Sequence, residues 1–295
     1  MTTYSRIGIT VKSDLSEKDE MLKSILSIIK KAGAHAHVDM PRVKGLKSAK
    51  GVPEFTCTED IDLLLVLGGD GTILRSVREL QNFSVPILTI NRGNIGFLAE
   101  MNAEEVPELL PKFLRGEGVI DERSVLRVVA KRKSKILADC FVLNEAVISQ
   151  GSIARLFDLK TMVNGEPLTT FRADGLILAT PTGSTAYTLA AGGPIVDPHL
   201  SAIILTPINP HSFSQKPIVL PGDHKVVVEV LTKENKFGGV EVSLTLDGQM
   251  YVTLQRHDII TATINAHTVK FLRGRKETFY TTLRTKLKWG ERPEE

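Results

Sequence analysis

The sequence predicts an α/β N-terminal domain with an open, mostly parallel sheet, followed by a β-rich, sandwich-like domain. The first third of the chain alternates short apolar runs with helical patterns, which is typical of a doubly wound sheet. From about residue 121 the helical patterns give way to short strand-like runs separated by turns. The length of 295 residues also favours two domains over one.

The α/β pattern covers residues 1–120. Runs rich in apolar and β-branched residues predict strands at 6–11, 35–40, 61–67 and 85–90. The third run, IDLLLVL, is apolar almost throughout, as in a parallel strand that is covered on both faces. Apolar residues at helical spacing predict helices at 15–33, 71–80 and 103–116, the last interrupted or bent by Pro107 and Pro111.

The β-rich domain is predicted to span residues 121–275. Its strand-like runs are SVLRVVAKR, ADCFVLNEAVIS, RLFDLKTMVNG, GLILAT, SAIILTPI, KVVVEVLT, VEVSLTLDG and DIITATINA. The tripeptides NGE and DGQ between runs are turn signals that favour tight hairpins. The closing stretch KETFYTTLRTKLKWG regains helical spacing, and we expect the segment 276–295 to pack on the first domain.

Composition and charge exclude several classes of function. The 37 basic and 34 acidic residues leave a net charge of +3, which gives no broad electrostatic case for nucleic acid or a membrane surface. Cys57 and Cys140 lie too far apart in the sequence to indicate a disulfide framework or a zinc site. No segment approaches the ~20 apolar residues of a spanning helix. We therefore expect a cytoplasmic protein that binds neither nucleic acid nor membranes.

The stretch GGDGT at 68–72 follows the apolar run that predicts the third strand. Its glycines allow backbone N–H groups to turn towards an anion at the start of the next helix. The pattern is neither a P-loop nor a dinucleotide fingerprint, and Asp70 stands among the glycines. A carboxylate here can accept a proton from an attacking hydroxyl or hold a cation, or it only caps the helix. The predicted phosphate-binding residues are Gly68, Gly69, Gly71 and Thr72.

A second group of polar residues follows in the β-rich part. Asn144 and Glu145 interrupt an apolar run and must be hydrogen-bonded, either to sugar hydroxyls or within a turn or bulge. Downstream, TTFRADGLILATPTGSTAYTLAAGGPIV brings a hydroxyl- and glycine-rich loop, a composition typical of ligand contacts. Within it Tyr187 could stack on a base and Arg172 could meet a phosphate, although each is also common as an ordinary surface or core residue.

The motifs GGDGT, NRGNIGFL, LNEAVI, RADGLILATPTGSTAYTLAAGGPIV and LDGQ occur in this order. In this the chain resembles NAD kinases of the bacterial type over nearly its whole length. GGDGT alone also resembles lipid kinases and, more loosely, phosphofructokinases, whereas TPTGSTAY with AGGP is highly specific. The resemblance implies phosphoryl transfer from ATP, or from inorganic polyphosphate, to the 2′-hydroxyl of the adenosine ribose of NAD, which yields NADP. It further implies a homo-oligomer, either a dimer or a tetramer.

Phosphoryl transfer calls for a divalent metal, Mg²⁺, which neutralises charge on the phosphate chain. The sequence has no evident set of protein ligands that would enclose it. This agrees with Mg²⁺ bound mainly through water and substrate phosphates, and no metal-ligating residue is predicted.

The resemblance also assigns roles to individual residues. Asp70 matches the general base, which contacts NAD, and Gly71 lies beside the substrate. Asn144 and Glu145 match the pair that binds NAD. Many members carry serine where this chain has Ala190. The other positions that match NAD contacts are Arg75, Arg155, Arg172, Asp174, Thr185, Ala186, Tyr187, Thr188, Ala190 and Gln249.

Two other functions fit parts of the sequence. A lipid kinase would share the GGDGT loop but needs a route for an acyl chain, and the sequence offers no basic or amphipathic membrane anchor. A non-catalytic NAD-binding regulator would keep Asn144, Glu145 and Tyr187 but has no need of an acid in the glycine turn. Asp70 therefore favours a kinase that acts on NAD.

Overall fold

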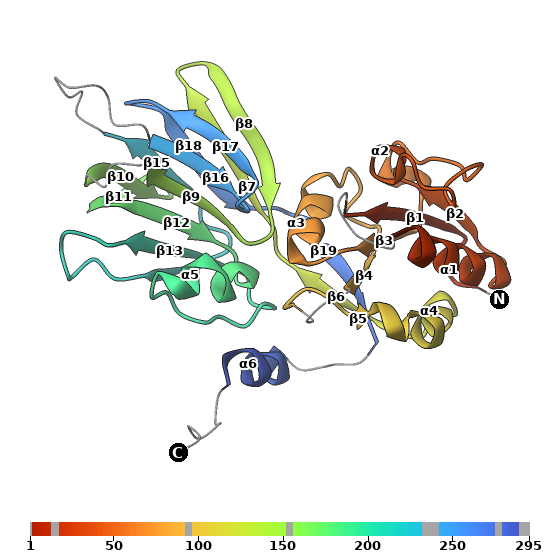
Figure 1. The fold of residues 1–295 in the computed structure, drawn as a ribbon. Coiled ribbons are helices and arrows are strands. Elements are labelled where there is room, and N and C mark those ends of the chain that lie inside the picture. The colour runs from red at the N-terminus through yellow and green to blue at the C-terminus, as the bar shows by residue number, and fades with distance from the viewer. Residues whose placement is uncertain are drawn as a thin grey trace. The chain divides into compact units, whose positions relative to one another are not determined.

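The computed structural model describes residues 2–12, 18–91, 96–151, 156–231, 242–274 and 279–288. Arg155, one of the predicted NAD-contacting residues, lies outside these ranges. The chain forms two compact units (Figure 1). Of the described residues, the first unit contains those up to Glu122 and those from Val269 onward, and the second contains Arg123–Thr268.

A mostly parallel sheet lies at the centre of the first unit (Figure 1). Its strand order is β2-β1-β3-β4-β19-β6, with β5 paired to β4. The pairings of β1 with β2 and β3, of β3 with β4, and of β4 with β5 and β19 are all parallel. The strands are β1 (Arg6–Val11), β2 (His35–Val38), β3 (Leu63–Leu67), β4 (Ile87–Asn91), β5 (Met101–Asn102), β6 (Val119–Arg123) and β19 (Val269–Arg273).

Helices accompany this sheet, and one of them corrects an expectation. Pro107 and Pro111 do not interrupt the helix that contains them, because it begins at Val106 and continues through Pro111. Pro107 thus lies in the first turn, where its missing N–H has no intrahelical role. The helices are α1 (Lys18–Lys31), α2 (Met40–Val43), α3 (Asp70–Arg78), α4 (Val106–Leu114) and α6 (Phe279–Leu287), with 3₁₀ turns at Thr58–Asp60 and Ala103–Glu105.

The last strand also changes the expected domain boundaries. Residues 121–275 were expected to form one β-rich domain, but β19 pairs in parallel with β4, with Phe271 opposite Ile87. The chain therefore returns to the first unit before residue 275, because β19 extends the parallel sheet. Helix α6, the described part of the segment 276–295, is grouped with the first unit and buries Leu283. Its packing against that unit stays a prediction.

The second unit consists of two antiparallel sheets, of order β11-β10-β15-β18-β7-β8 and β14-β13-β12-β9-β16-β17. Buried apolar residues from both sheets form one core, including Val128, Ile148, Leu244 and Ile260, as in a sandwich. The predicted fold class is confirmed. The strands are β7 (Leu126–Arg132), β8 (Lys135–Val142), β9 (Glu145–Gln150), β10 (Phe157–Val163), β11 (Glu166–Ala173), β12 (Gly175–Ala179), β13 (Ala202–Ile208), β14 (Ile218–Pro221), β15 (Val226–Val230), β16 (Val242–Leu246), β17 (Met250–Leu254) and β18 (Ile259–Ile264).

The run ADCFVLNEAVIS forms two strands instead of the single one expected. Strand β8 ends at Val142 in one sheet and β9 begins at Glu145 in the other. Leu143 and Asn144 form the crossing between the sheets. Because both halves of the run are apolar, hydrophobicity alone could not reveal the crossing. The polar residues Asn144 and Glu145 lie at the point where the chain passes from one sheet to the other.

Two hairpins follow their predicted turn signals. In the NGE turn between β10 and β11, Asn164 and Gly165 have φ of 51° and 86°. In the DGQ turn between β16 and β17, Asp247 and Gly248 have φ of 48° and 66°. Positive φ at both central residues is the requirement of a type I′ turn, which asparagine, aspartate and glycine tolerate best.

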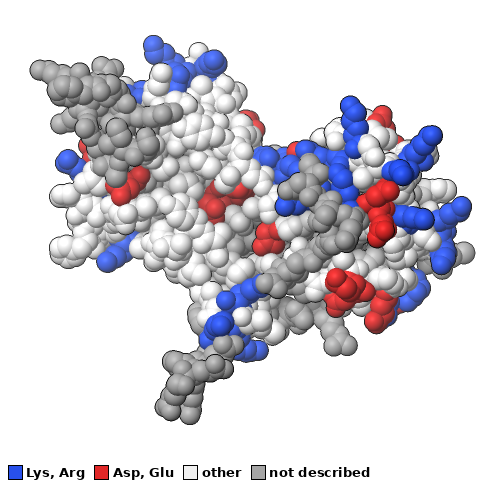
Figure 2. Space-filling view, in the orientation of Figure 1, with Lys and Arg blue, Asp and Glu red and all other residues white. Residues whose placement is uncertain are grey.

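Charged residues are distributed differently over each unit. Figure 2 shows Lys and Arg side chains gathered on the first unit, whereas the visible face of the second is mostly uncharged. Cys57 and Cys140 are not joined by a disulfide. Among the described helices, none is long and apolar enough to cross a membrane.

Candidate functional site

The glycine loop connects β3 to α3 in the first unit. All five residues of β3 are buried, so the packing of this strand fixes the position at which the loop begins. Gly68 has φ of 152°, and a side chain there would overlap Thr72. Gly69 is the residue that precedes α3, and the helix begins at Asp70. The N–H of Gly68 donates to the carbonyl oxygen of Ile90 at 2.9 Å, and that of Thr72 to the carbonyl oxygen of Gly69 at 2.8 Å. Anion binding by this loop therefore stays a prediction, which rests on the N-terminus of α3.

Asp70 does not cap the helix, because it is the first helical residue and Gly69 holds the cap position. Its carboxylate instead accepts the backbone N–H of Phe97 on Oδ2, at 3.2 Å. Within the described parts of the chain, the other oxygen, Oδ1, is buried and has no hydrogen-bond partner. A Cβ on Gly96 would overlap both oxygens, so the chain at 96–97 fits closely around this group.

The surroundings of Asp70 suit a base. Burial raises the pKa of Asp70, while the backbone N–H groups of Phe97 and Leu98 and the charges of Lys286 and Arg273 oppose the rise. Arg273 also donates to the carbonyl oxygen of Leu98 at 3.1 Å, which supports the segment that contacts Asp70. A carboxylate with increased proton affinity and a free oxygen can accept a proton from a hydroxyl.

Arg75 lies on α3 among other charged side chains. Burial is the main cause that lowers the pKa of Arg75, followed by the positive charge of Arg42; Glu79 and Asp39 oppose this effect. In the described residues, Nε and Nη2 of Arg75 are buried without a hydrogen-bond partner. A guanidinium so placed favours an anionic ligand.

In the second unit, Glu145 is the first residue of β9 and is 8% exposed. Burial, and then the negative charge of Asp247, raise the pKa of Glu145 to about 8, although the backbone N–H of Tyr187 opposes the rise. Glu145 is therefore mostly protonated at neutral pH. Its Oε2 is buried and, among the residues described, lacks a hydrogen-bond partner. A neutral carboxyl can both donate and accept hydrogen bonds.

The first residue of TPTGSTAY, Thr180, hydrogen-bonds to the backbone of Leu143 and Asn144. The backbone N–H of Thr180 donates to the carbonyl oxygen of Asn144 at 2.9 Å, and the Thr180 hydroxyl donates to that of Leu143. A Cβ on Gly183 would overlap the Asn144 backbone, so the glycine permits this close approach. The two motifs that the sequence placed almost 40 residues apart are thus in direct contact.

The hydroxyl-rich loop folds back on itself. Residues Thr182–Thr185 form a 3₁₀ turn, followed by the short helix α5 (Tyr187–Ala190). Ser184 hydrogen-bonds to both backbone groups of Val196 at 3.1 Å, which returns the AGGPIV stretch to the loop. Tyr187 is 45% exposed. Thr188 is fully buried, and its hydroxyl has no partner in the part of the chain that is described.

The remaining predicted residues are more scattered. Arg172 is exposed on β11, and Asp174 follows that strand and accepts a hydrogen bond from Asn209 at 3.1 Å. Because Ala179 pairs with Glu145 and Asp174 precedes Gly175, the length of β12 separates Asp174 from Glu145. Thr185 and Ala186 are half-buried, and Gly71, Ala190 and Gln249 are exposed. Asn144, Glu145 and Tyr187 form the compact group.

Sequence reasoning missed several residues that contact the predicted ones. NRGNIGFL was noted without a role for its members, although Gly96 and Phe97 touch Asp70. In LDGQ only Gln249 was predicted to contact NAD, although Asp247 of the same motif accepts the backbone N–H groups of Asn144 and Glu145. No local sequence pattern predicted the contact of Arg273, because this residue lies 175 positions from the carbonyl group to which it donates.

No cluster of three or more His, Cys, Asp or Glu residues that could enclose a metal ion occurs among the residues that the structure describes. The buried Oδ1 of Asp70 is a single hard oxygen donor. Such an arrangement fits Mg²⁺ only in the mode in which substrate phosphates and water supply most ligands.

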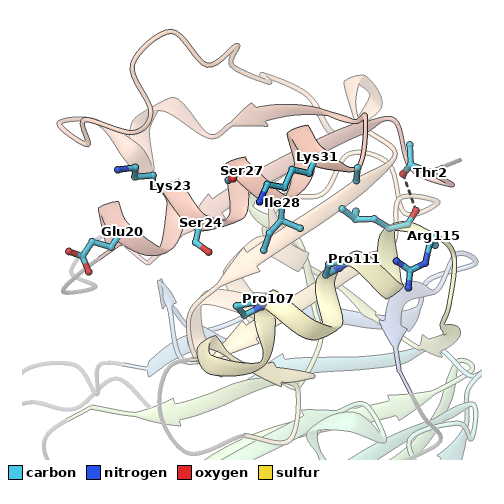
Figure 3. Close-up of a pocket in the computed structure, with 12 residues that line it drawn as sticks. Thr2, Glu20, Lys23, Ser24, Ser27, Ile28, Lys31, Pro107, Pro111 and Arg115 are labelled. Carbon is cyan, nitrogen blue, oxygen red and sulfur yellow. Dashed lines mark hydrogen bonds between the residues drawn. The ribbon is translucent and has the colours of Figure 1, made fainter.

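A separate groove of about 910 Å³ lies between α1 and α4 (Figure 3). Lys23 and Lys31 of α1 and Pro107 and Pro111 of α4 are among the residues that line it. None of the predicted site residues lines it. The groove therefore does not coincide with the glycine loop.

Comparisons with known proteins agree on one family. Models of the ATP-NAD kinase N-terminal and C-terminal domains match residues 7–118 and 143–274. The chain is 40% identical to an NAD kinase of Citrifermentans bemidjiense over 263 residues, which are 88% of this chain and 90% of that protein. It is 35% identical to an NAD kinase of Solibacter usitatus over 292 residues, covering 99% of this chain and all of that one.

Solved structures give the same result. The yeast NADH kinase in complex with NADH superposes with a TM-score of 0.83 at 25% identity, covering 99% of this chain and 90% of that one. An NAD kinase from Archaeoglobus fulgidus in complex with ATP has a TM-score of 0.73 at 26% identity, covering 96% of this chain and 98% of that one.

Proposed function

Because the chain belongs to the NAD kinase family, whose reaction phosphorylates NAD to NADP with ATP as donor, we propose that Asp70 is the general base of this transfer. The observation that carries the proposal is the buried Oδ1 of Asp70, which lacks a hydrogen-bond partner among the described residues and belongs to the first residue of α3. Most buried polar atoms that only stabilise a fold have a hydrogen-bond partner, so an oxygen without one points to a ligand.

In the proposed step the 2′-hydroxyl of the adenosine ribose of NAD attacks the terminal phosphorus of ATP. Its proton moves to Oδ1 of Asp70 as the new O–P bond forms, and the bond between the terminal phosphorus and the bridging oxygen breaks to release ADP. A ribose hydroxyl is a weak nucleophile, so a base beside it lowers the barrier. The Phe97 N–H keeps the carboxylate in place for this transfer.

The glycine loop, Thr72 and Arg75 are proposed to bind phosphate groups. The N-terminus of α3 favours an anion. Arg75 adds a positive charge: its Nε and Nη2 lack hydrogen-bond partners among the described residues, and Nε lies 4.0 Å from Oε1 of Glu79. A divalent cation, Mg²⁺, is proposed to neutralise charge on the phosphate chain when bound. The buried Oδ1 of Asp70 would supply one oxygen ligand, with water and substrate phosphates supplying the others.

Asn144, Glu145 and Tyr187 are proposed to bind NAD. A neutral Glu145 beside the Asn144 amide can donate to one ribose hydroxyl and accept from another. The exposed Tyr187 ring is suited to stacking on a base. Contacts from the other predicted positions stay predictions: Gly71, Arg155, Arg172, Asp174, Thr185, Ala186, Thr188, Ala190 and Gln249.

The homo-oligomeric state, the cytoplasmic location and the use of polyphosphate also stay predictions. Light scattering during gel filtration tests the oligomer, with a dimer or tetramer expected. A mass equal to the 32.4 kDa of one chain contradicts it.

The function is tested by incubating the purified protein with NAD, Mg²⁺ and ATP, and in parallel with polyphosphate or diacylglycerol. We expect NADP from NAD and ATP. Phosphorylated diacylglycerol without NADP would instead indicate a lipid kinase. NAD binding without any phosphorylated product would indicate a regulator, and would contradict the role of Asp70.

A further inference from the structure

Asp247, the acid of the LDGQ motif, is not used by the proposed chemistry, yet it is only 5% exposed. It is the first central residue of the turn between β16 and β17, and the N–H of Gln249 closes that turn by donating to the Leu246 carbonyl oxygen at 3.0 Å. A buried carboxylate is unfavourable unless donors surround it. The partners of Asp247 therefore indicate its purpose.

Asp247 accepts three successive backbone N–H groups from the crossing between β8 and β9. Its Oδ2 accepts from Leu143 at 3.0 Å, and its Oδ1 accepts from Asn144 at 2.9 Å and from Glu145 at 3.1 Å. In return, the backbone N–H of Asp247 donates to the carbonyl oxygen of Glu145 at 3.0 Å. Four hydrogen bonds thus connect one turn to the residues that include the proposed NAD-binding pair.

These bonds replace those that a sheet would supply. Leu143 and Asn144 belong to neither strand, so their N–H groups have no place in a ladder. Asp247 supplies acceptors for both, while Thr180 bonds to the carbonyl groups of the same two residues from the other side. The backbone at 143–145 is therefore fixed by its donors and by its acceptors.

We propose that Asp247 is a positioning residue for NAD binding, which holds the backbone of 143–145 so that the Asn144 and Glu145 side chains keep one orientation towards the substrate. The inference rests on the proposed role of that pair. Removing Asp247 should weaken NAD binding, because a binding group that is free to reorient must be ordered by the ligand. It should leave ATP binding and the chemical step nearly unchanged.

A second property of Asp247 supports this assignment. Strands β12 and β16, which flank β9, contain no charged residue, and α5 contributes only Tyr187 as a titratable one. Asp247 is the charged group that, after burial, does most to raise the pKa of Glu145. One side chain thus holds the pair in place and favours the neutral form of its acid.

The test compares Asp247→Asn and Asp247→Ala with the wild type. Asparagine tolerates the positive φ and can still accept the Asn144 and Glu145 N–H groups, but its amide NH₂ would face the N–H of Leu143. Alanine removes every acceptor. We expect KM for NAD to rise by about threefold for Asn and about tenfold or more for Ala, from the usual worth of such bonds. The kcat and the KM for ATP should change by less than about twofold.

Asp258→Asn provides a matched control. Asp258 is also buried in the second unit, where it accepts the Gln255 N–H at 2.7 Å and pairs with Arg132 at 2.8 Å. We expect this variant to lower the melting temperature without changing KM for NAD. An equal rise of KM in Asp258→Asn at matched fractions of folded protein would mean that general loosening is responsible, and would overturn the proposal. If the alanine variant does not fold, the asparagine variant carries the same test.

Asn144→Ala distinguishes the proposed role of Asn144 and Glu145 in NAD binding from the proposed positioning role of Asp247. If it leaves KM for NAD unchanged, the proposed role of the pair fails, and the inference about Asp247 fails with it. If it raises KM while both Asp247 variants bind NAD normally, only the positioning role is wrong. A rise of KM in Asn144→Ala and in both Asp247 variants supports both.

Discussion

Among the described residues, each unit buries one carboxyl group that has an oxygen without a hydrogen-bond partner, and the charges near the two groups shift their pKa values in opposite directions. Asp70 in the first unit is faced by backbone N–H groups and by Lys286 and Arg273, which limit the rise that burial causes in its pKa. Glu145 in the second unit is faced by the negative Asp247, which adds to the effect of burial on the pKa. When nearby charges shift the pKa values of two buried acids in opposite directions, the two acids are suited to different roles. Asp70 is suited to accept a proton, and Glu145 to bind while it stays neutral.

The largest effect is expected from Asp70→Asn. Asparagine preserves the size of the side chain but cannot take the hydroxyl proton, so kcat should fall by ~10²-fold or more. The Kd for NAD should change by less than about threefold, because binding does not require the charge. Steady-state rates of NADP formation and calorimetric NAD titrations measure the two quantities.

The matched control is Asp60→Asn, because Asp60 is an exposed acid in the same unit. Its kcat should equal that of the wild type. Nearly normal turnover in Asp70→Asn would contradict the role of Asp70 as the general base, and with it the difference in role between Asp70 and Glu145.

A smaller effect is expected from Gly96→Ala, which tests how closely Asp70 is held. The new methyl group would overlap both carboxylate oxygens, so the acid must move and kcat should fall by about tenfold. Gly8→Ala is the control, since its methyl group would overlap Ile61 away from the loop. That variant should lose stability but keep kcat at 20 °C within about twofold. Equal losses of kcat in both variants would indicate a general packing defect.

Glu145→Gln is expected to be much milder than Asp70→Asn. Glutamine resembles the protonated acid, so KM for NAD at pH 7 should stay within about threefold of the wild type, whereas Glu145→Ala should raise it by about tenfold. A tenfold rise in the glutamine variant at pH 7 would show that the ionised form is the one that binds. The comparison of the two acids would then fail.

The same substitution predicts a pH effect on stability. Glu145 titrates at 4.5 when exposed and at about 8 when folded. Between these values the folded chain keeps a proton that the unfolded chain has lost, so the free energy of unfolding falls as pH rises from 4.5 to about 8. Glu145→Gln lacks this loss, and its melting temperature relative to the wild type should increase by about 2 °C or more between pH 5 and pH 8. A pH-independent difference would contradict the raised pKa of Glu145.

The smallest effect is expected from Arg273→Lys. Arginine supports the Asp70 contact indirectly, through the carbonyl group of Leu98 and the carboxylate of Glu100. Lysine keeps the charge but loses the fork geometry, so kcat should fall by about threefold. Arg127→Lys, at an exposed ion pair of the second unit, should have no effect on kcat.

The sequence predicted the parts of the molecule that depend on local pattern. Apolar runs predicted the parallel strands, and the DGQ signal predicted the turn that contains Asp247. The position of Asp70 after a buried strand was also readable, because strand, glycines and helix are adjacent in the chain.

Features that depend on distant parts of the chain were not predictable. No local pattern shows that β19 joins the first sheet, or that the chain changes sheets at Asn144. The neighbours that tune the two acids are equally remote, since Asp247 lies 102 positions from Glu145 and Arg273 acts on a segment 175 positions earlier. Motif resemblance identified the chemistry, but the protonation states follow from these contacts.

The pH dependence of kcat/KM for NAD, measured for the wild type and for Glu145→Gln, tests the contrast between the acids most directly. We predict a bell-shaped profile for the wild type, in which activity rises as Asp70 ionises and falls near pH 8 as Glu145 loses its proton. Glu145→Gln should keep the acidic limb and lose the decline near pH 8. An unchanged alkaline limb in that variant would contradict the assignment of Glu145 as the neutral member of the two acids.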